Sequence, residues 1–215
     1  MTPVFRFDDA MLLDRIERLF PDTRLVFAAT CAQRLQSGYE EYAERTAKRA
    51  VSANAKRIVS ANSRLAASAM DEVWSGLLSG GWNRRQIQRL AEKCVEVIPT
   101  QEEFVPASHQ YLEGVASAIG YALSSCLTRA SRDVARVARV AYDAAEEIAI
   151  KNEDPHSFTT AVEQRLLSDP AVQLELQRQS RDLAELAASD LRHPQVKESA
   201  LRMRERARAE AWKFP

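Results

Sequence analysis

Apolar residues recur every three or four positions along most of this 215-residue chain, a spacing typical of amphipathic α-helices. The clearest case is the stripe formed by Val134, Val137, Ala141, Ala144 and Ile148. No stretch alternates apolar and polar residues with an excess of β-branched side chains, the pattern expected of strands. We therefore predict an all-α protein, a single-domain antiparallel bundle of about seven to nine helices without a sheet.

Residues that begin or end helices divide the N-terminal part of this pattern. Asp8 or Asp9 can cap a first helix, and Pro21 ends it. A second helix is expected over residues 23–35, with Ser37-Gly38 as its break.

A long alanine-rich segment follows, opening at Tyr39 and reaching Leu78 with no proline and no glycine before Gly76. It is one bent helix or two, and Gly80-Gly81 ends it. Asn83 caps the next helix, whose apolar residues share one face before a proline terminates it.

Small apolar residues dominate from Pro106 to Leu127 and indicate the central, most buried helix. Three later helices are expected to begin at a residue followed by proline: Asp154-Pro155, Asp169-Pro170 and His193-Pro194. The two stripes that follow in the sequence are Val172, Leu176, Gln179, Leu183 and Leu186, then Val196, Ala200, Met203, Ala207 and Ala211.

Composition supports a helical cytoplasmic protein. Thirty Lys and Arg balance thirty Asp and Glu, and only six glycines and eight prolines interrupt the helices. The N-terminus lacks the features of a secretory signal, and the longest uncharged run is too short to span a membrane. Cys31, Cys94 and Cys126 form no CxxC pair, so we interpret them as reduced thiols in the core.

One segment departs from the overall balance of acidic and basic residues. The sequence KRAVSAN at residues 48–54 is followed, one alanine later, by KRIVSAN at residues 56–62, and from Arg45 to Arg64 there are six bases and no acid. In one continuous helix the two copies are rotated by about 80°, which spreads the bases over a broad side. The block is a solvent-exposed helix extension, a surface for an acidic protein, or a nucleic-acid surface.

The segment from Leu25 to Leu35, LVFAATCAQRL, with Tyr39 beyond it, resembles the bacterial YjaG-like family of unknown function (DUF 416). Weaker matches follow in order at Trp74 and Leu77, Ile98-Pro99 with Glu103-Phe104, and Asp169-Pro170-Ala171-Val172 with Glu175 and Gln179. The resemblance implies an all-α bacterial cytoplasmic protein, and it transfers no catalytic residues.

The resemblance also bears on domain organisation. We expect one helical domain over residues 1–215, with a family-like core at 8–190 and a C-terminal helix at 194–213. Within the family-like core, the interval from Tyr39 to Trp74 is longer than the family pattern. The excess coincides with the basic repeat, so we interpret residues 45–64 as a helix extension.

Motifs for catalysis or metal binding are absent from the sequence. His109 and Glu113 are four residues apart, but two ligands make no metal site and no HExxH motif occurs. No GxSxG, P-loop or GxGxxG motif is present, and the acids Asp143, Glu146 and Glu147 fit a solvated helix face. We predict no catalytic residue, no metal and no cofactor.

The three tryptophans receive different interpretations. Trp74 is expected in the core, whereas Trp82 and Trp212 are candidates for exposed contact residues. The arginine-rich C-terminal helix that contains Arg202 to Arg208 is interpreted as solvated.

The leading hypothesis is a non-enzymatic protein-binding module, more specifically an immunity protein that covers the active site of a cognate toxin. The expected contact residues are Lys48, Arg49, Lys56, Arg57, Arg64 and Trp82. A nucleic-acid-binding role for the same block is the first alternative, and the second is an enzyme with a pocket around His109, Glu113 and Tyr121. No membrane partner is expected, and the oligomeric state stays open.

Overall fold

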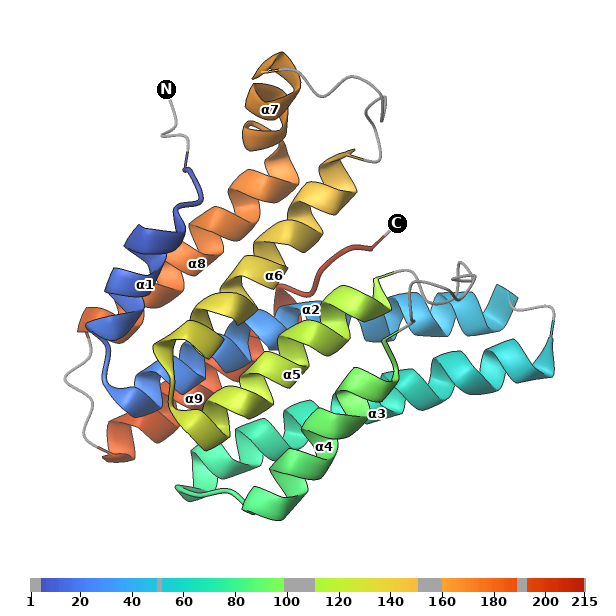
Figure 1. Cartoon of the computed structure of the whole chain (residues 1–215), viewed down its shortest axis with the longest axis horizontal. Helices are drawn as coiled ribbons and strands as arrows, with labels where there is room; N and C mark the ends of the chain where they lie inside the picture. The colour runs from blue at the N-terminus through green and yellow to red at the C-terminus, as the bar shows by residue number, and fades with distance from the viewer. Residues whose placement is uncertain (1–4, 50–51, 99–110, 151–159, 189–192, 215) are drawn as a thin grey trace.

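The computed structural model describes residues 5–49, 52–98, 111–150, 160–188 and 193–214. Over these residues the chain forms nine α-helices and no strand, which confirms the predicted all-α class and the absence of a sheet in the described part of the chain. The helices pack into one bundle (Figure 1). They are α1 (Asp9–Glu17), α2 (Pro21–Arg49), α3 (Ala53–Ser79), α4 (Arg84–Glu96), α5 (Leu112–Thr128), α6 (Ser131–Ile150), α7 (Thr160–Leu167), α8 (Pro170–Ala188) and α9 (His193–Ala209).

Helix α2 is the centre of the bundle. It packs against α3, α5, α6, α8 and α9, and 17 of its 29 residues are buried, against 9 of 17 in α5. The expectation that α5 is the most buried helix is therefore wrong. Apolar content ranked the helices wrongly by burial, because α2 buries polar side chains such as Thr30, Gln33 and Arg34.

Most predicted helix starts are confirmed. The side chain of Asp8 accepts a hydrogen bond from the Met11 backbone N–H at 2.9 Å, and Asn83 accepts one from Gln86 at 3.2 Å. Pro21, expected to end the first helix, is the first residue of α2, a position where a proline loses no helical hydrogen bond. The predicted start at Asp154-Pro155 lies outside the described residues.

The predicted break at Ser37-Gly38 is wrong, because α2 continues through both residues to Arg49. Gly38 instead provides space for the C-terminal segment. A Cβ atom at Gly38 would lie 2.4 Å from the Trp212 carbonyl oxygen, and the Trp212 N–H donates to the Arg34 carbonyl at 3.1 Å. Gly38 therefore allows the backbone of the C-terminal segment to approach α2 closely, and it does not end the helix.

The real break falls inside the basic repeat. Helix α2 ends at Arg49 and α3 begins at Ala53, so the segment from Tyr39 to Leu78 is divided between two helices and the single-helix interpretation of the repeat is wrong. Ser52 caps α3, accepting a hydrogen bond from the Ala55 N–H at 3.1 Å. The boundary of this helical hairpin therefore lies within the first copy of the repeat, and the second copy lies wholly in α3.

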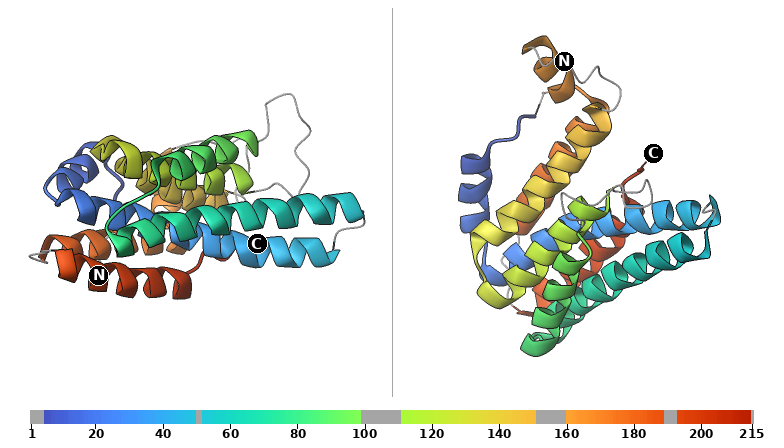
Figure 2. Two further views of the ribbon diagram at one scale, coloured as in Figure 1. Left: turned by 90° about the horizontal axis from the view of Figure 1, so that it is seen from below. Right: turned by 45° about the vertical axis from the view of Figure 1, so that its right-hand side comes forward.

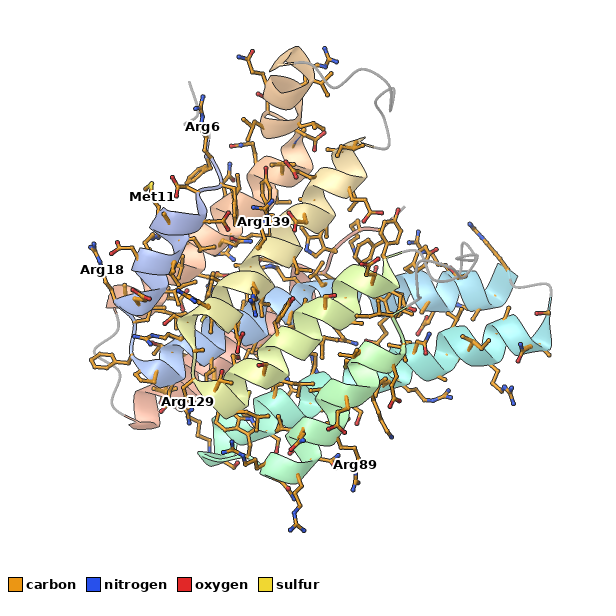
Figure 3. The ribbon with its side chains drawn as sticks, in the orientation of Figure 1. Arg6, Met11, Arg18, Arg89, Arg129 and Arg139 are labelled. Atoms are coloured by element: carbon orange, nitrogen blue, oxygen red, sulfur yellow. The ribbon has the colours of Figure 1, made fainter. Side chains whose placement is uncertain are left out.

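The core contains the apolar stripes that the sequence predicted. Every member of the two stripes between residues 172 and 211 is buried, as are the three cysteines and Trp74. Charged side chains such as Arg18 and Arg89 point outward (Figure 3). Among the described helices, none is both long and apolar enough to cross a membrane.

Candidate functional site

The hairpin of α2 and α3 extends beyond the rest of the bundle. We define the arm as its outer part, residues 40–49 of α2 and 52–64 of α3, which reach past α4 and α5 in all three ribbon views (Figures 1 and 2). Inside the arm, Ala43 and Val59 are buried, whereas the charged side chains on its outer surfaces are exposed. The arm is thus a thin two-helix projection with solvent on most of its sides.

The five predicted basic contact residues all lie on this arm. Lys48 and Arg49 end α2, Lys56 and Arg57 lie in the first turns of α3, and Arg64 follows two turns later. All five are exposed, and the contacts that Lys48 and Arg57 make are local. The Lys48 ammonium lies 4.0 Å from the Glu44 carboxylate, and Arg57 donates to the Asn54 side chain at 3.1 Å.

Trp82, the sixth predicted contact residue, lies at the opposite end of α3 from the basic residues. Its indole N–H donates to the Val73 carbonyl at 3.2 Å, and the ring occupies the space left by Gly76. The Arg129 guanidinium covers the ring at 5.2 Å from its centroid. The half-buried Trp82 is therefore held within the fold and separated from the arm.

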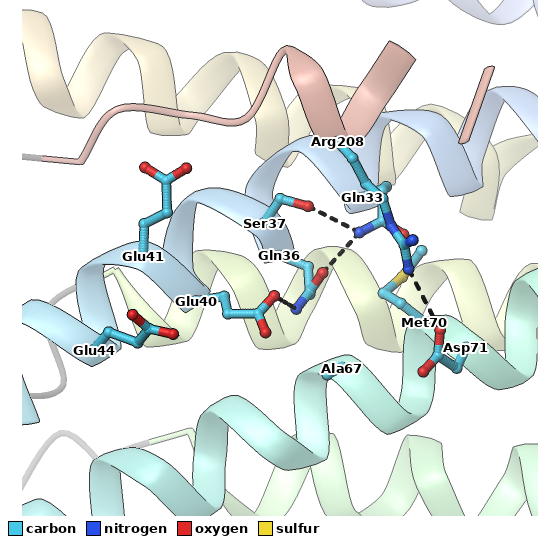
Figure 4. A pocket seen from close by; sticks show the side chains of 10 residues that line it. All are labelled: Gln33, Gln36, Ser37, Glu40, Glu41, Glu44, Ala67, Met70, Asp71 and Arg208. Carbon is cyan, nitrogen blue, oxygen red and sulfur yellow. Dashed lines mark hydrogen bonds and ion pairs between the residues drawn. The ribbon is translucent and has the colours of Figure 1, made fainter. Parts of the chain in front are cut away.

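A groove of about 460 Å³ lies between α2, α3 and α9, at the base of the arm (Figure 4). Polar side chains form its floor. The Gln33 amide donates to Gln36 at 2.7 Å and to Ser37 at 3.0 Å, while its oxygen accepts the Trp74 indole N–H at 2.7 Å. Because Trp74 is fully buried, this chain of hydrogen bonds fixes the orientation of the Gln33 amide.

Acidic residues form the wall of the groove toward the arm. Glu40 and Glu44 are turned toward the groove in Figure 4, whereas Glu41 points away, to Lys213 at 3.0 Å. On the other side Asp71 is neutralised by Arg204 at 2.5 Å. The negative charge of the groove therefore comes chiefly from Glu40 and Glu44 of α2, although the Glu44 carboxylate also lies 4.0 Å from the Lys48 ammonium.

The C-terminal part of the chain packs on the bundle, with the Trp212 N–H bound to the Arg34 carbonyl of α2, which corrects two expectations. Trp212 is buried, at 4% exposure, although it was expected to be exposed. The arginines of α9 are not merely solvated, because they form ion pairs with the rest of the bundle: Arg206 with Glu185 at 2.6 Å and with Asp182 at 2.9 Å, and Arg202 with Glu185 at 3.5 Å.

A buried charge cluster joins α2 to α8 beneath this surface. The fully buried Arg34 guanidinium binds Asp182 at 2.7 Å and Glu175 at 2.9 Å. Burial alone would lower the pKa of Arg34, but the two carboxylates outweigh it and hold the pKa above its ordinary value. Burial raises the pKa of the adjacent Cys31 thiol, which therefore stays protonated and is no nucleophile.

Sequence reasoning missed this cluster, although one signal was present. Glu175 was noted only as a family-like residue, and Arg34 lies within the LVFAATCAQRL segment. A charged residue inside an otherwise apolar helical segment indicates a buried partner. The sequence alone does not identify that partner, because α8 is about 140 residues away along the chain.

The remaining candidates for chemistry are not brought together among the described residues. His109 lies outside them, Glu113 is exposed at the start of α5, and the Arg136 guanidinium lies 5.4 Å from the centroid of the Tyr121 ring. Glu146 accepts a hydrogen bond from the Tyr142 hydroxyl at 2.6 Å. In the part of the chain that the structure describes, no three His, Cys, Asp or Glu side chains are grouped to hold a metal ion.

No family model matches the chain, and no curated protein matches it either. Among solved structures, the chain is similar to the crystal structure of a DUF416 family protein from Shewanella baltica OS155. The TM-score is 0.70 with 13% sequence identity, over 91% of this chain and 92% of that chain. This likeness shows a shared fold, and it agrees with the resemblance seen in the sequence.

Proposed function

We propose that the protein is a protein-binding module that holds its partner against the arm. The observation that supports the proposal is the position of the basic repeat at a projecting hairpin, with exposed bases on both helices. Such a projection is accessible from several sides, and its positive field is not cancelled by neighbouring acids at its end.

An acidic protein surface is the partner that this chemistry fits. Arg49 and Arg57 can each pair with a carboxylate through two parallel hydrogen bonds, and Lys48 and Lys56 add charge that speeds the encounter. The more specific role is that of an immunity protein, in which the arm would cover the active site of a toxin. The product of the neighbouring gene is the partner to test first.

Charge reversal tests this function. The variant Lys48→Glu, Arg49→Glu, Lys56→Glu, Arg57→Glu should bind the neighbouring gene product about tenfold or more weakly in calorimetry, because each lost charge pair contributes up to about 1 kcal/mol. The matched control reverses four exposed bases on α4: Arg84, Arg85, Arg89 and Lys93. It has the same net charge and should bind as the wild type does.

Two results would count against this function. Absence of a stoichiometric complex would remove the neighbouring gene product as the partner, and equal weakening by both variants would remove the arm from the interface. Circular dichroism of both variants would show whether each retains the helical content of the wild type.

Nucleic acid is the second candidate partner, favoured by six bases without an acid between Arg45 and Arg64. The acidic groove wall beside the arm opposes it, because Glu40 and Glu44 would repel phosphates at the base of the same hairpin. If nucleic acid is the partner, the affinity for RNA or DNA should fall steeply as the salt concentration rises. Lack of retention on a nucleic-acid column at low salt would dispose of this candidate.

A further inference from the structure

The residues that follow α9 form a non-helical strap on α2. We define the strap as residues 210–214, which begin directly after the end of α9 at Ala209. The apolar side chains of Ala211, Trp212 and Phe214 are buried, at 7%, 4% and 2% exposure. In Figure 1 the strap runs toward the side of the bundle from which the arm projects. The strap is therefore packed on the fold although it belongs to no helix.

The strap first contacts the central part of the bundle. The Trp212 N–H donates to the Arg34 carbonyl at 3.1 Å, and the Trp212 backbone lies against Gly38, where a side chain would leave no room for it. At the start of the strap, Glu210 accepts hydrogen bonds from Arg181 of α8 at 2.7 and 2.8 Å. This end of the strap is fixed to α2 and α8.

The other end of the strap contacts the arm. The Lys213 ammonium lies 3.0 Å from the Glu41 carboxylate, and the Arg45 guanidinium donates to the Phe214 carbonyl. Positions 34, 38, 41 and 45 of α2 are three or four residues apart, a spacing that places them on one face of a helix. The contacts of the strap therefore follow a single stripe from the centre of α2 into the arm.

Three aromatic rings join the strap, the arm and the start of α5. The Phe214 ring stacks on Tyr111, which immediately precedes α5, with ring centroids 4.5 Å apart. Tyr42, on the arm, meets Tyr111 edge-on at 5.3 Å and Phe214 at 6.5 Å. Aromatic pairs in these arrangements are more stable than their buried area alone provides. Phe214 thus restrains the base of the arm against the rest of the fold.

Two features favour release of the strap without unfolding of the bundle. The indole N–H of Trp212 is buried, and the described part of the chain supplies no hydrogen-bond acceptor for it. A buried donor without an acceptor is unfavourable, and release into water would restore its hydrogen bond. The side chains of Lys213 and Glu41 are 76% and 56% exposed, so water and salt weaken the ion pair between them.

We propose that the strap regulates the arm. When docked, the strap fixes the direction in which the arm projects, and when released, it leaves the arm free to bend at its base. A mobile arm must be ordered before it can hold a partner, and the entropy lost in that step weakens binding. The effect on binding rests on the proposed function, whereas the effect on the motion of the arm does not.

Amide hydrogen exchange of the full chain, followed residue by residue by NMR, tests release of the strap. The Trp212 amide reports it directly, because its hydrogen bond to Arg34 joins the strap to α2. In the wild type this amide should exchange at least about tenfold faster than the amide of the buried Leu35, because local opening costs less than global unfolding. Equal rates would show that the strap opens only when the whole protein unfolds, and would overturn the proposal.

Phe214→Ala tests the link between the strap and the arm. Exchange of the amides at residues 43–49 should become at least about threefold faster, while exchange at residues 25–35 changes less. Phe20→Ala is the control, because Phe20 is 59% exposed just before the start of α2 and its loss should leave the arm unchanged. Faster exchange at Trp212 with unchanged exchange in the arm would overturn the proposal. If Phe214→Ala does not fold, Phe214→Leu keeps an apolar side chain without the stacked ring and should act in the same direction.

Partner binding separates this inference from the proposed function. Phe214→Ala retains all five basic contact residues, so it should bind the neighbouring gene product about three- to tenfold more weakly in calorimetry, in proportion to the lost population of the docked arm. Unchanged affinity together with faster exchange in the arm would overturn the regulation of binding. A wild type that binds no neighbouring gene product would remove that partner from the proposed function, and the exchange rates would still decide whether the strap holds the arm.

Discussion

Two glycines inside helices each provide space for a tryptophan. At Gly38 the backbone of Trp212 takes the place of a side chain, and at Gly76 the indole of Trp82 does so, with a Cβ atom 2.0 Å from the ring nitrogen. Neither glycine ends its helix, although glycine is the commonest sign of a helix end. Sequence reasoning misread Gly38 for this reason, because the group that approaches it lies 174 residues further along the chain.

Replacing Gly38 by alanine should destabilise the protein by about 1–3 kcal/mol, the usual effect of overpacking. The added methyl group displaces Trp212 and with it Phe214, whose ring stacks on Tyr111 at 4.5 Å. Urea unfolding followed by circular dichroism measures the loss. Gly120→Ala is the control, since a Cβ atom there meets nothing within 4 Å and should stabilise α5 by up to about 1 kcal/mol. Equal stability of the two variants would contradict the close approach.

Replacing Arg34 by methionine should cost about 3–5 kcal/mol, because it leaves the buried Glu175 carboxylate without the cation that binds it, while Asp182 keeps Arg206. Chemical unfolding gives the loss, and Arg18→Met, at an exposed pair with Asp14, is the control with an expected change below about 0.5 kcal/mol. Adding Glu175→Gln to Arg34→Met should recover part of the stability. A loss as small as the control's would mean that the cluster contributes little.

At the scale of elements, the hairpin shows what helical periodicity can and cannot predict. Periodicity correctly located most helix starts and the apolar faces of α6, α8 and α9. It left the segment from Tyr39 to Leu78 open as one bent helix or two, because the Ser52 cap lies inside an alanine-rich run without glycine or proline. The two serines of the repeat have identical neighbours before and after in the pattern VSAN, yet only Ser52 caps a helix.

The two repeat serines offer a matched test of this hairpin. Ser52→Ala should destabilise the protein by about 1 kcal/mol through loss of the cap on the Ala55 N–H. Ser60→Ala, inside α3, should be neutral or slightly stabilising because alanine is the better helix former. Thermal unfolding of both variants measures the difference. A larger loss for Ser60→Ala would place the turn elsewhere in the repeat.

At the scale of the whole molecule, the candidate site combines one feature visible in the sequence with others that only the packing creates. The basic block is local, and its five predicted contact bases, four in the repeat and Arg64 beyond it, could be named from the sequence. The groove could not be predicted from the sequence, because its lining comes from α2, α3 and α9, from positions as distant as Gln33 and Arg208. The C-terminal region is tied to α8 by ion pairs in both directions, because Arg206 of α9 binds Glu185 and Arg181 of α8 binds Glu210, the residue that follows α9.

These ion pairs between α8 and the C-terminal region should make the stability of the protein depend on pH. Burial alone would raise the pKa of Glu210, but hydrogen bonds from Arg181 at 2.7 and 2.8 Å, with the nearby positive charges, outweigh burial and lower it below the ordinary 4.5. The pKa of Glu185 is lowered in the same way by Arg206 and Arg202. A carboxyl with a lowered folded-state pKa stabilises the fold above its unfolded-state pKa, and this contribution is lost as the pH falls through the folded-state value.

Glu210→Gln should therefore be less stable than the wild type at neutral pH, and the difference should shrink as the pH falls below about 4.5, where the unfolded carboxyl becomes protonated. Urea unfolding at a series of pH values measures the difference. Glu205→Gln, at an exposed position of α9, removes one negative charge away from these ion pairs and should follow the wild type throughout. A Glu210→Gln deficit that stays constant down to low pH would show that lost packing, and not the charge of Glu210, is responsible.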